Sequence, residues 1–313
     1  VVEFTNDSSI DDVTTYKTDL SNITVSLSDT SNLSEVTIVL SAADSVTGND
    51  PGFTLDATSV TSFDSSYNFT VSSTSPLTIK VSGTVADGSS LGTDLVADMT
   101  TLLSEVKLVP PEDYSGTSTI TTSVTSRETG AEESPATTDN FDITVSAVAE
   151  TPTVTGAAAA TATLQEDTDI LLDLNVTIND NDASETVSQV RISGLTSIGE
   201  QNLTGILVDG SGNLVGSSDG SGTTILTSAE YNAALAGTTP IYFRPPTDYS
   251  GNVSLNIVAV VQEPNGSTAT SSSSIITFDL AAVSEEASAS SNDINVVEFT
   301  NDSSIDDVTT YKT

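Results

Sequence analysis

The feature of this sequence that most constrains its fold is a verbatim repeat. The segment Val1 to Thr18, VVEFTNDSSIDDVTTYKT, recurs letter for letter at Val296 to Thr313, at the other end of a chain of 313 residues. Self-similarity at a fixed period is typical of a tandem array, in which each unit contacts its neighbours. We therefore expect one full period of an array followed by the first strand of the next repeat. The apolar positions of that inter-repeat strand are Val296, Val297, Phe299, Ile305 and Val308.

A second repeat inside the period divides it in two. The pattern PPxDYSG occurs twice, and we call the shift that takes Pro110 to Pro245 the motif offset. Its residues are Pro110, Pro111, Asp113, Tyr114 and Gly116 in one copy, and Pro245, Pro246, Asp248, Tyr249 and Gly251 in the other. A final strand follows each copy, and we match Phe141, Ile143 and Val145 with Phe278, Leu280 and Ala282. The sequence thus predicts two related domains, 1–149 and 150–295, with 296–313 as the first strand of the next repeat.

Short runs in which apolar and polar residues alternate fill both predicted domains. Examples are Asn22 to Ser28 and Glu35 to Ser41, and turn residues separate the runs. A period of two places one face of a strand on the core and the other in water. Two segments, Thr93 to Ser104 and Ser228 to Leu235, have helical character instead. About seven strands per domain predict an all-β fold of two tandem antiparallel Greek-key sandwiches.

The paired prolines of the motif predict the end of a strand. Proline donates no ladder hydrogen bond and holds the preceding residue extended. Tyr114 and Tyr249 then lie at a corner between sheets, where a buried ring can bind nearby backbone through its hydroxyl. A ligand-binding role for the two tyrosines is the alternative.

Composition excludes several classes of function. Lys and Arg number 7 against 44 Asp and Glu, for a formal charge of -37, which disfavours any nucleic acid partner because phosphate binding needs clustered cations. The chain has no His, Cys or Trp, which removes the usual nucleophile pairs and soft metal ligands. Paired carboxylates alone could hydrolyse glycosides, but no Trp is present to stack on a sugar, so we expect no enzyme. No run of apolar residues is long enough for membrane insertion in this segment.

Several stretches resemble a known family. They are the PPxDYSG motif, the strand FDITVSAVAETPTV from Phe141 to Val154, the stretch Gln165-Glu166-Asp167-Thr168 and the loop Asn179 to Glu185. Together they are similar to the bacterial Ig-like, cadherin-like repeats of giant secreted surface proteins and adhesins. The predicted second domain matches along most of its length, and the first from about Thr100. The resemblance implies two Ig-like/cadherin-like sandwiches, an extracellular or cell-surface location, many tandem copies and often bound calcium.

The chemistry of the side chains also favours Ca²⁺ as a cofactor. Calcium takes 6 to 8 oxygen ligands, and this chain is rich in oxygen donors. Candidate ligands at the start of the second domain are Glu150, Glu166, Asp167, Asp180, Asp182 and Glu185. Equivalent candidates in the first domain are Asp11, Asp12, Asp29 and Glu35, with Glu285 and Glu286 from a preceding unit. The alternative is that these are solvated carboxylates of ordinary turns.

The expected function is a structural repeat unit of a long extracellular fibre, stalk or cell-surface filament or adhesin, which bound calcium would stiffen. Its partners are then neighbouring copies of itself, in the same chain or head to tail, with the first strand of one repeat able to add to a neighbour's sheet. The alternative is an adhesive binding module that recognises a glycan or a host or cell-surface protein through loops at the sandwich ends. Few aromatic residues and arginines disfavour strong binding hot spots.

Overall fold

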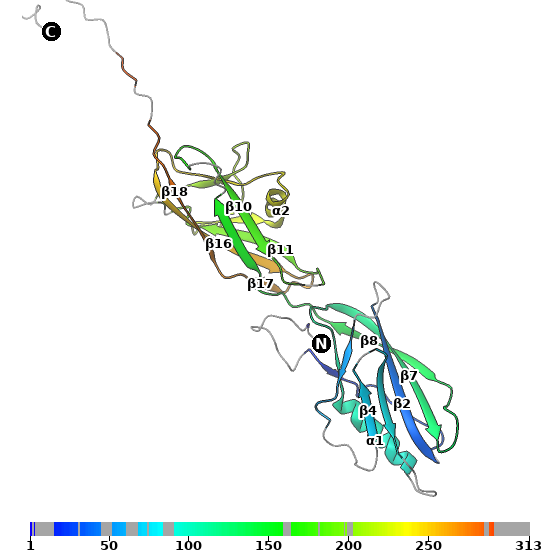
Figure 1. Cartoon of the computed structure of the whole chain (residues 1–313). Helices are drawn as coiled ribbons and strands as arrows, with labels where there is room; N and C mark the ends of the chain where they lie inside the picture. The colour runs from blue at the N-terminus through cyan, green and yellow to red at the C-terminus, as the bar shows by residue number, and fades with distance from the viewer. Residues whose placement is uncertain are drawn as a thin grey trace, which may run out of the picture.

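The computed structural model describes residues 1, 3, 16–30, 32–44, 52–60, 68–73, 75–83, 91–158, 164–180, 182–196, 198, 203–284 and 288–290. The inter-repeat strand expected in 296–313 and the candidate ligands Asp11, Asp12, Glu285 and Glu286 lie outside these residues. The chain forms two β-rich halves placed end to end (Figure 1). No helix among the described residues has the length and apolar character needed to cross a membrane.

The N-terminal half contains two antiparallel sheets. Strands β1, β6 and β3 form one sheet in the order β1-β6-β3, and the other has the order β4-β5-β2-β7-β8. The elements of this half are β1 (Thr18–Asp19), β2 (Leu33–Asp44), β3 (Thr54–Asp56), β4 (Asn68–Ser72), β5 (Leu77–Ser82), α1 (Leu91–Glu105), β6 (Lys107–Val109), β7 (Gly116–Glu128) and β8 (Thr137–Val145).

The C-terminal half repeats this plan with additional strands. One sheet has the order β12-β15-β10-β9, and the other has β13-β14-β11-β16-β17 with β18 also paired to β16. The elements are β9 (Thr153–Ala158), β10 (Ile170–Thr177), β11 (Thr186–Ser193), β12 (Ile206–Val208), β13 (Ser217–Ser218), β14 (Thr223–Thr227), α2 (Ser228–Leu235), β15 (Tyr242–Arg244), β16 (Gly251–Gln262), β17 (Thr268–Thr270) and β18 (Ser274–Leu280).

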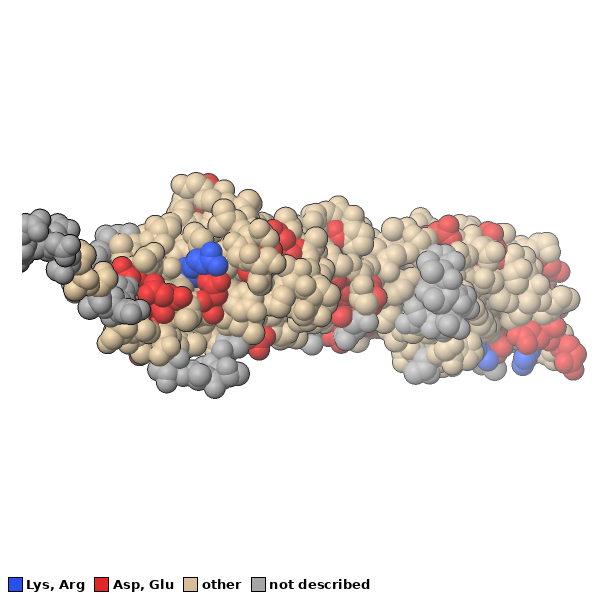
Figure 2. All heavy atoms as spheres, turned by 90° about the horizontal axis from the view of Figure 1, so that it is seen from above, with Lys and Arg blue, Asp and Glu red and all other residues tan. Residues whose placement is uncertain are grey.

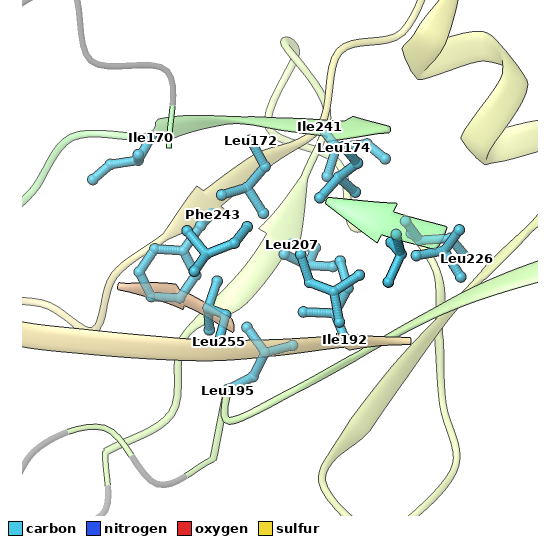
Figure 3. Packing of buried hydrophobic residues seen from close by; sticks show 14 of the residues in the cluster. Ile170, Leu172, Leu174, Ile192, Leu195, Leu207, Leu226, Ile241, Phe243 and Leu255 are labelled. Atoms are coloured by element: carbon cyan, nitrogen blue, oxygen red, sulfur yellow. The ribbon is translucent and has the colours of Figure 1, made fainter. Parts of the chain in front are cut away.

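Each half has its own hydrophobic core between its two sheets. In the N-terminal half, Leu108 of one sheet and Ile38 of the other are fully buried in the same cluster. In the C-terminal half, Phe243 and Leu255 meet in the same way (Figure 3). The two clusters share no residue. This packing, with the antiparallel pairing of all the named strands, confirms the predicted all-β fold of antiparallel sandwiches.

The two helices form where the sequence predicts them. Helix α1 buries Leu95, Met99, Leu102 and Leu103, a spacing that places them on one face. Helix α2 begins with a capping box, in which the Thr227 hydroxyl accepts from the Glu230 amide and the Glu230 carboxylate accepts from the Thr227 amide. Each helix leads into the short strand that carries the Pro-Pro motif.

The last strands of the two halves correspond in a register different from the one expected. Gly116 pairs with Val145 and Gly251 pairs with Leu280, so the motif offset holds through the final strand. Phe141 therefore corresponds to Ile276 and not to Phe278. The expected match of Phe141 with Phe278 places both residues on the correct face, but it is displaced by two residues along the strand. Alternation with a period of two cannot detect such a displacement, because it leaves every residue on the same face.

One predicted strand does not pair with any neighbour among the described residues. Only Thr18 and Asp19 form β1, by pairing with Leu108 and Lys107 of β6. A strand is also predicted over Asn22 to Ser28. These residues alternate between exposed and more buried positions, as in a strand, but they form no ladder with the described residues. The alternating pattern is thus present, but no partner strand completes it within the part of the chain that the structure describes.

Candidate metal site

Carboxylates from both halves meet where the halves join. Glu3, Asp180 and Asp182 each place a carboxylate oxygen within 4.8 Å of the others. Glu185 and Glu263 lie close enough for their charges to act on this group. We call these five residues the junction cluster. Glu3 belongs to the N-terminal half, and the other four to the C-terminal half.

The loop between β10 and β11 positions three members of the cluster through its own backbone. Asp180 accepts from the Asp182 amide at 2.9 Å and from the Glu185 amide at 3.0 Å. Asp182 accepts from the Ser184 amide at 2.8 Å. Ala183 between them has φ 63°, a left-handed conformation that turns the loop back. Asp and Ser favour such turns because their short side chains bond to nearby backbone amides.

Glu3 reaches the junction because the first residues bind beside the end of β8. The Glu3 amide donates to the Ser146 carbonyl at 2.9 Å, and the Ser146 amide donates to the Val1 carbonyl at 2.9 Å. The Glu3 carboxylate then accepts from the Val148 amide at 2.7 Å. These backbone contacts hold Glu3 in place, and the residue is 7% exposed.

Hydrogen bonds tie the two halves together around the cluster. Ser115 of the PPxDYSG motif donates to Asp182 through its amide at 2.8 Å and its hydroxyl at 2.7 Å. The Ala149 amide donates to the Ser267 hydroxyl at 3.1 Å. The hairpin after β16 adds a third contact, from the Asn265 amide group to the Ala147 carbonyl at 2.6 Å. The junction is therefore a built interface of specific polar contacts.

Burial and mutual repulsion raise the pKa of three of these carboxylates, Glu3, Glu185 and Glu263. Burial is the largest cause that raises the pKa of Glu3, to about 8, against the hydrogen bond from Val148. The charges of Asp182, Glu263 and Asp180 raise this pKa further. A raised pKa means that the metal-free junction disfavours the charged form.

Glu185 shows the same effect. Burial raises the pKa of Glu185 to about 7, opposed by the hydrogen bond from the Glu150 amide and assisted by the charge of Glu263. Burial also raises the pKa of Glu263, although the Ser184 hydroxyl donates to it at 2.7 Å. For Asp182, desolvation acts upward but hydrogen bonds from Ser115 and Ser184 outweigh it, so its pKa lies below the ordinary value.

The cluster fits a divalent cation with oxygen ligands. Ca²⁺ binds oxygen at about 2.3–2.6 Å, so two ligands of one ion lie at most about 4.6–5.2 Å apart. The three carboxylate oxygens all lie within 4.8 Å of one another, which is close enough for one ion. The Glu185 Oε2 atom is buried and has no hydrogen-bond donor, on a residue that is 5% exposed. Among the described residues, no ion pair of a Lys or Arg reaches the cluster. An acceptor left buried without a donor is costly, and a bound cation would satisfy it.

The six candidate ligands of the predicted second domain divide into two groups. Glu150, Asp180, Asp182 and Glu185 come together at the junction. Glu166 and Asp167 lie at the other end of β10, where Glu166 accepts from the Val283 amide at 2.6 Å and Asp167 accepts from the Asp248 amide at 3.1 Å. Glu166 and Asp167 lie just before β10 and Asp180 lies just after it. The length of this strand therefore separates Glu166 and Asp167 from the junction.

Sequence reasoning missed Glu3 and Glu263. A signal for Glu3 exists, because Glu166 makes the same contacts in the other half. The Glu166 amide donates to the Ala281 carbonyl, and the Glu166 carboxylate accepts from the Val283 amide. At the motif offset, Val283 is the counterpart of Val148, which donates to Glu3. Glu263 sits at the end of β16, and nothing in the local sequence places it opposite the loop of Asp180.

The candidate ligands of the predicted first domain do not form a comparable group among the described residues. Glu35 pairs with Lys80 at 2.6 Å and lies 4.0 Å from Arg127, so cations already neutralise it. Asp29 is exposed.

The PPxDYSG motif forms the same corner in both halves. Asp113 has φ 55° and Asp248 has φ 58°, so each turns the chain in a left-handed conformation two residues after the second proline. The Tyr249 hydroxyl donates to the Asn252 carbonyl at 2.8 Å. The Tyr114 ring packs edge-on against Phe53 at 5.6 Å between centroids. The corner of the first copy delivers Ser115 to the junction.

Comparisons with known proteins show a likeness in solved structures alone. No family model matches the chain. No curated protein matches its sequence. Fibronectin(III)-like modules of Clostridium thermocellum CbhA align over 85% of this chain and 88% of theirs, at 12% identity and a TM-score of 0.22. The major pilin subunit of Bacillus cereus aligns over 77% of this chain and 69% of its own, at 11% identity and a TM-score of 0.27.

A tetra-tandem repeat from the extending region of a large adhesion protein is also similar. It aligns over 82% of this chain at 16% identity and a TM-score of 0.22, and the chain spans 48% of its length. These values are too low to transfer any activity to this chain.

Proposed function

We propose that this chain is a non-catalytic structural repeat unit of a long extracellular fibre, stalk or cell-surface filament. In this proposal the two halves are sandwich domains, 1–149 and 150–295, and Ca²⁺ binds at the junction between them. The observation that carries it is the junction cluster, in which five carboxylates from both halves converge without a basic partner among the described residues. Neighbouring copies of the unit are the proposed partners.

An ion at the junction would act mechanically. Without it, the charges of Asp180 and Asp182 in one half disfavour ionisation of Glu3 in the other, and above a pH of about 8, where Glu3 is charged, the repulsion favours separation of the two halves. A bound cation turns this repulsion into shared coordination, and the Ser115 contacts to Asp182 already hold the loop in place. The expected consequence is a stiff, extended joint in calcium and a more flexible one without it.

The surface supports the fibre in a second way. Acidic side chains occur in several groups along the visible face, with few basic ones (Figure 2). A net charge of -37 keeps parallel fibres apart and soluble. Such a surface suits an extracellular object whose units contact one another end to end.

The test is calorimetric titration of the full chain with Ca²⁺, and its thermal unfolding in calcium and in chelator. The variant is Asp182→Asn, and the matched control is Asp219→Asn, because Asp219 accepts from the Ser221 amide in the same kind of turn, away from the junction. Calcium at 100 times its Kd should stabilise the wild type and the control by about 2.7 kcal/mol, and Asp182→Asn much less.

Small-angle scattering of the same samples measures the joint. The wild type should have a narrower distribution of end-to-end dimensions in calcium than in chelator. The absence of binding at millimolar Ca²⁺, or equal binding by wild type and Asp182→Asn, would contradict the calcium junction.

A further inference from the structure

One strand of the C-terminal half has no counterpart among the described residues of the N-terminal half. The pairing of β1 with β6 corresponds to that of β10 with β15, and β2, β7 and β8 correspond to β11, β16 and β18. Strand β9 pairs with the edge of β10 from Leu172 to Thr177. Among the described residues of the N-terminal half, no strand takes the place of β9.

Strand β9 closes one side of the C-terminal core. It packs on β16 and β18 as well as on β10. Gly156 at its centre lies directly over two isoleucines, since a Cβ atom there would come within 2.5 Å of Ile257 Cδ1 and 2.7 Å of Ile276 Cδ1. Small inward residues are therefore required of this strand.

The same place in the N-terminal half is an open groove. The motif offset makes Thr122 and Phe141 the counterparts of Ile257 and Ile276. Both line a cavity of about 250 Å³ together with Ile23 and Val124. A second cavity of about 170 Å³ shares Val124 and continues along Val25 and Leu27.

One wall of the groove is an extended segment, Asn22 to Leu27, that pairs with no strand among the described residues. From Asn22 to Leu27, exposed residues alternate with more buried ones, and Val25 is 6% exposed. Thr24 to Leu27 make no backbone hydrogen bond to the described part of the chain. An extended edge with unpaired amides and carbonyls is a template for another strand.

We propose that the groove accepts Ser288 to Asn292 of the preceding copy of this unit as its missing strand. The residues Ala147-Val148-Ala149-Glu150, just ahead of β9, correspond at the motif offset to Ala282-Val283-Ser284-Glu285. Thr153, where β9 begins, then corresponds to Ser288. Ala289 and Ser291 take the inward places of Val154 and Gly156, and both have short side chains, as the inward residues of β9 do.

The verbatim repeat gives the same order of segments. In the C-terminal half, β9 comes before Leu164-Gln165-Glu166, which binds beside β18 through Ala281. In the array, Ser288 to Asn292 come before Val296-Val297-Glu298, which is identical to Val1-Val2-Glu3. This inference rests on the proposed head-to-tail array, and it makes each N-terminal half complete only when another unit precedes it.

The test places residues 284–295 directly ahead of Val1 in the full chain and follows amide hydrogen exchange. The amides of Thr24 to Leu27 should exchange about 100-fold more slowly than in the unextended chain, since they gain ladder partners. The matched control carries Ala289→Asp and Ser291→Asp in the added copy, which brings charge to the apolar groove, and should show no slowing. Amides of β2, such as that of Ile38, report in every sample that the half is folded.

Two results would overturn the proposal. One is unchanged exchange at Thr24 to Leu27 in an extended chain whose β2 amides remain protected. The other is strong protection of these amides in the unextended chain, which would mean that its own residues fill the groove. Calcium titration of the same extended chain tests the junction independently, so failure of the strand and failure of the proposed function are distinguishable.

Discussion

At the scale of single residues, the role of a carboxylate depends on its surroundings and not on its residue type. Glu3 and Glu166 each accept a hydrogen bond from a backbone amide just beyond the final strand of their half. Glu3 also meets Asp180 and Asp182 of the other half, whereas Glu166 is outside that group of carboxylates. The pair therefore isolates the effect of the junction from the effect of the backbone contact.

Replacing Glu3 by Gln should have opposite effects with and without calcium. In chelator at a pH above about 8, where the Glu3 carboxylate is charged, Glu3→Gln removes a buried charge that repels its neighbours, and we expect a gain of about 1 kcal/mol in the free energy of unfolding. In saturating calcium, the loss of a ligand should cancel that gain. Glu166→Gln is the control, and urea unfolding in both conditions is the measurement. Equal behaviour of the two variants would remove Glu3 from the ion site.

The metal-free junction should lose stability as the pH rises from about 5 to 8. The pKa of Glu3 is raised to about 8 and that of Glu185 to about 7, above their value of 4.5 in the unfolded chain. Within this window the unfolded state binds fewer protons than the folded state, so the free energy of unfolding falls with pH. Thermal midpoints in chelator across this range measure the effect, and calcium should flatten the curve. A midpoint that rises with pH in chelator would contradict these shifts.

At the scale of elements, β9 shows how one strand decides whether a sandwich is closed. Its inward residues Val154, Gly156 and Ala158 are small because β16 and β18 already fill the space with isoleucines. Its outward residues face water. The same alternation occurs at Asn22 to Leu27, but there no described strand covers the neighbouring core.

Gly156→Ala should destabilise the C-terminal half by about 1–3 kcal/mol, as overpacking of a filled core does. The added methyl group would approach Ile257 and Ile276 far closer than van der Waals contact allows. Thr155→Ala, on the exposed face of the same strand, is the control and should change stability by less than about 0.5 kcal/mol. Urea unfolding followed by hydrogen exchange in β16 assigns the loss to this half. A Gly156→Ala variant as stable as the control would show that β9 lies farther from the core.

At the scale of the whole molecule, charge and shape act together. The halves lie end to end (Figure 1), and the chain carries a net charge of -37. Repulsion between distant carboxylates is screened by salt beyond a Debye length of about 10 Å at 0.1 M. The repulsion inside the junction acts over a few ångströms and is screened much less.

Sodium chloride and calcium should therefore stabilise the molecule by separable amounts. In chelator, raising the ionic strength from about 0.02 to 0.5 M should raise the thermal midpoint, because general repulsion weakens. Millimolar calcium added at the higher ionic strength should raise the midpoint again, and magnesium should do so less because it demands a tighter octahedral site. If sodium chloride abolishes the calcium effect, the ion acts by screening alone.

The sequence by itself determined the classes of local structure in this protein. Alternation predicted the strands and their buried faces, and the apolar spacing from Leu95 to Leu103 predicted α1, because both periods follow directly from backbone geometry. The loop of Asp180, Asp182 and Glu185 was also visible in the sequence, since its contacts are local.

Only the tertiary structure decided which segments meet. Glu3 reaches Asp180 across more than half of the chain through the end of β8, while Glu166, much nearer to Asp180 in sequence, lies at the other end of β10. Pairing between distant segments likewise sets the register of the last strand. It also leaves Asn22 to Leu27 without a partner strand among the described residues. The physical reason is that the alternation of side chains specifies which face of a strand is buried, whereas the ends of a strand and its partners depend on the path of the whole chain.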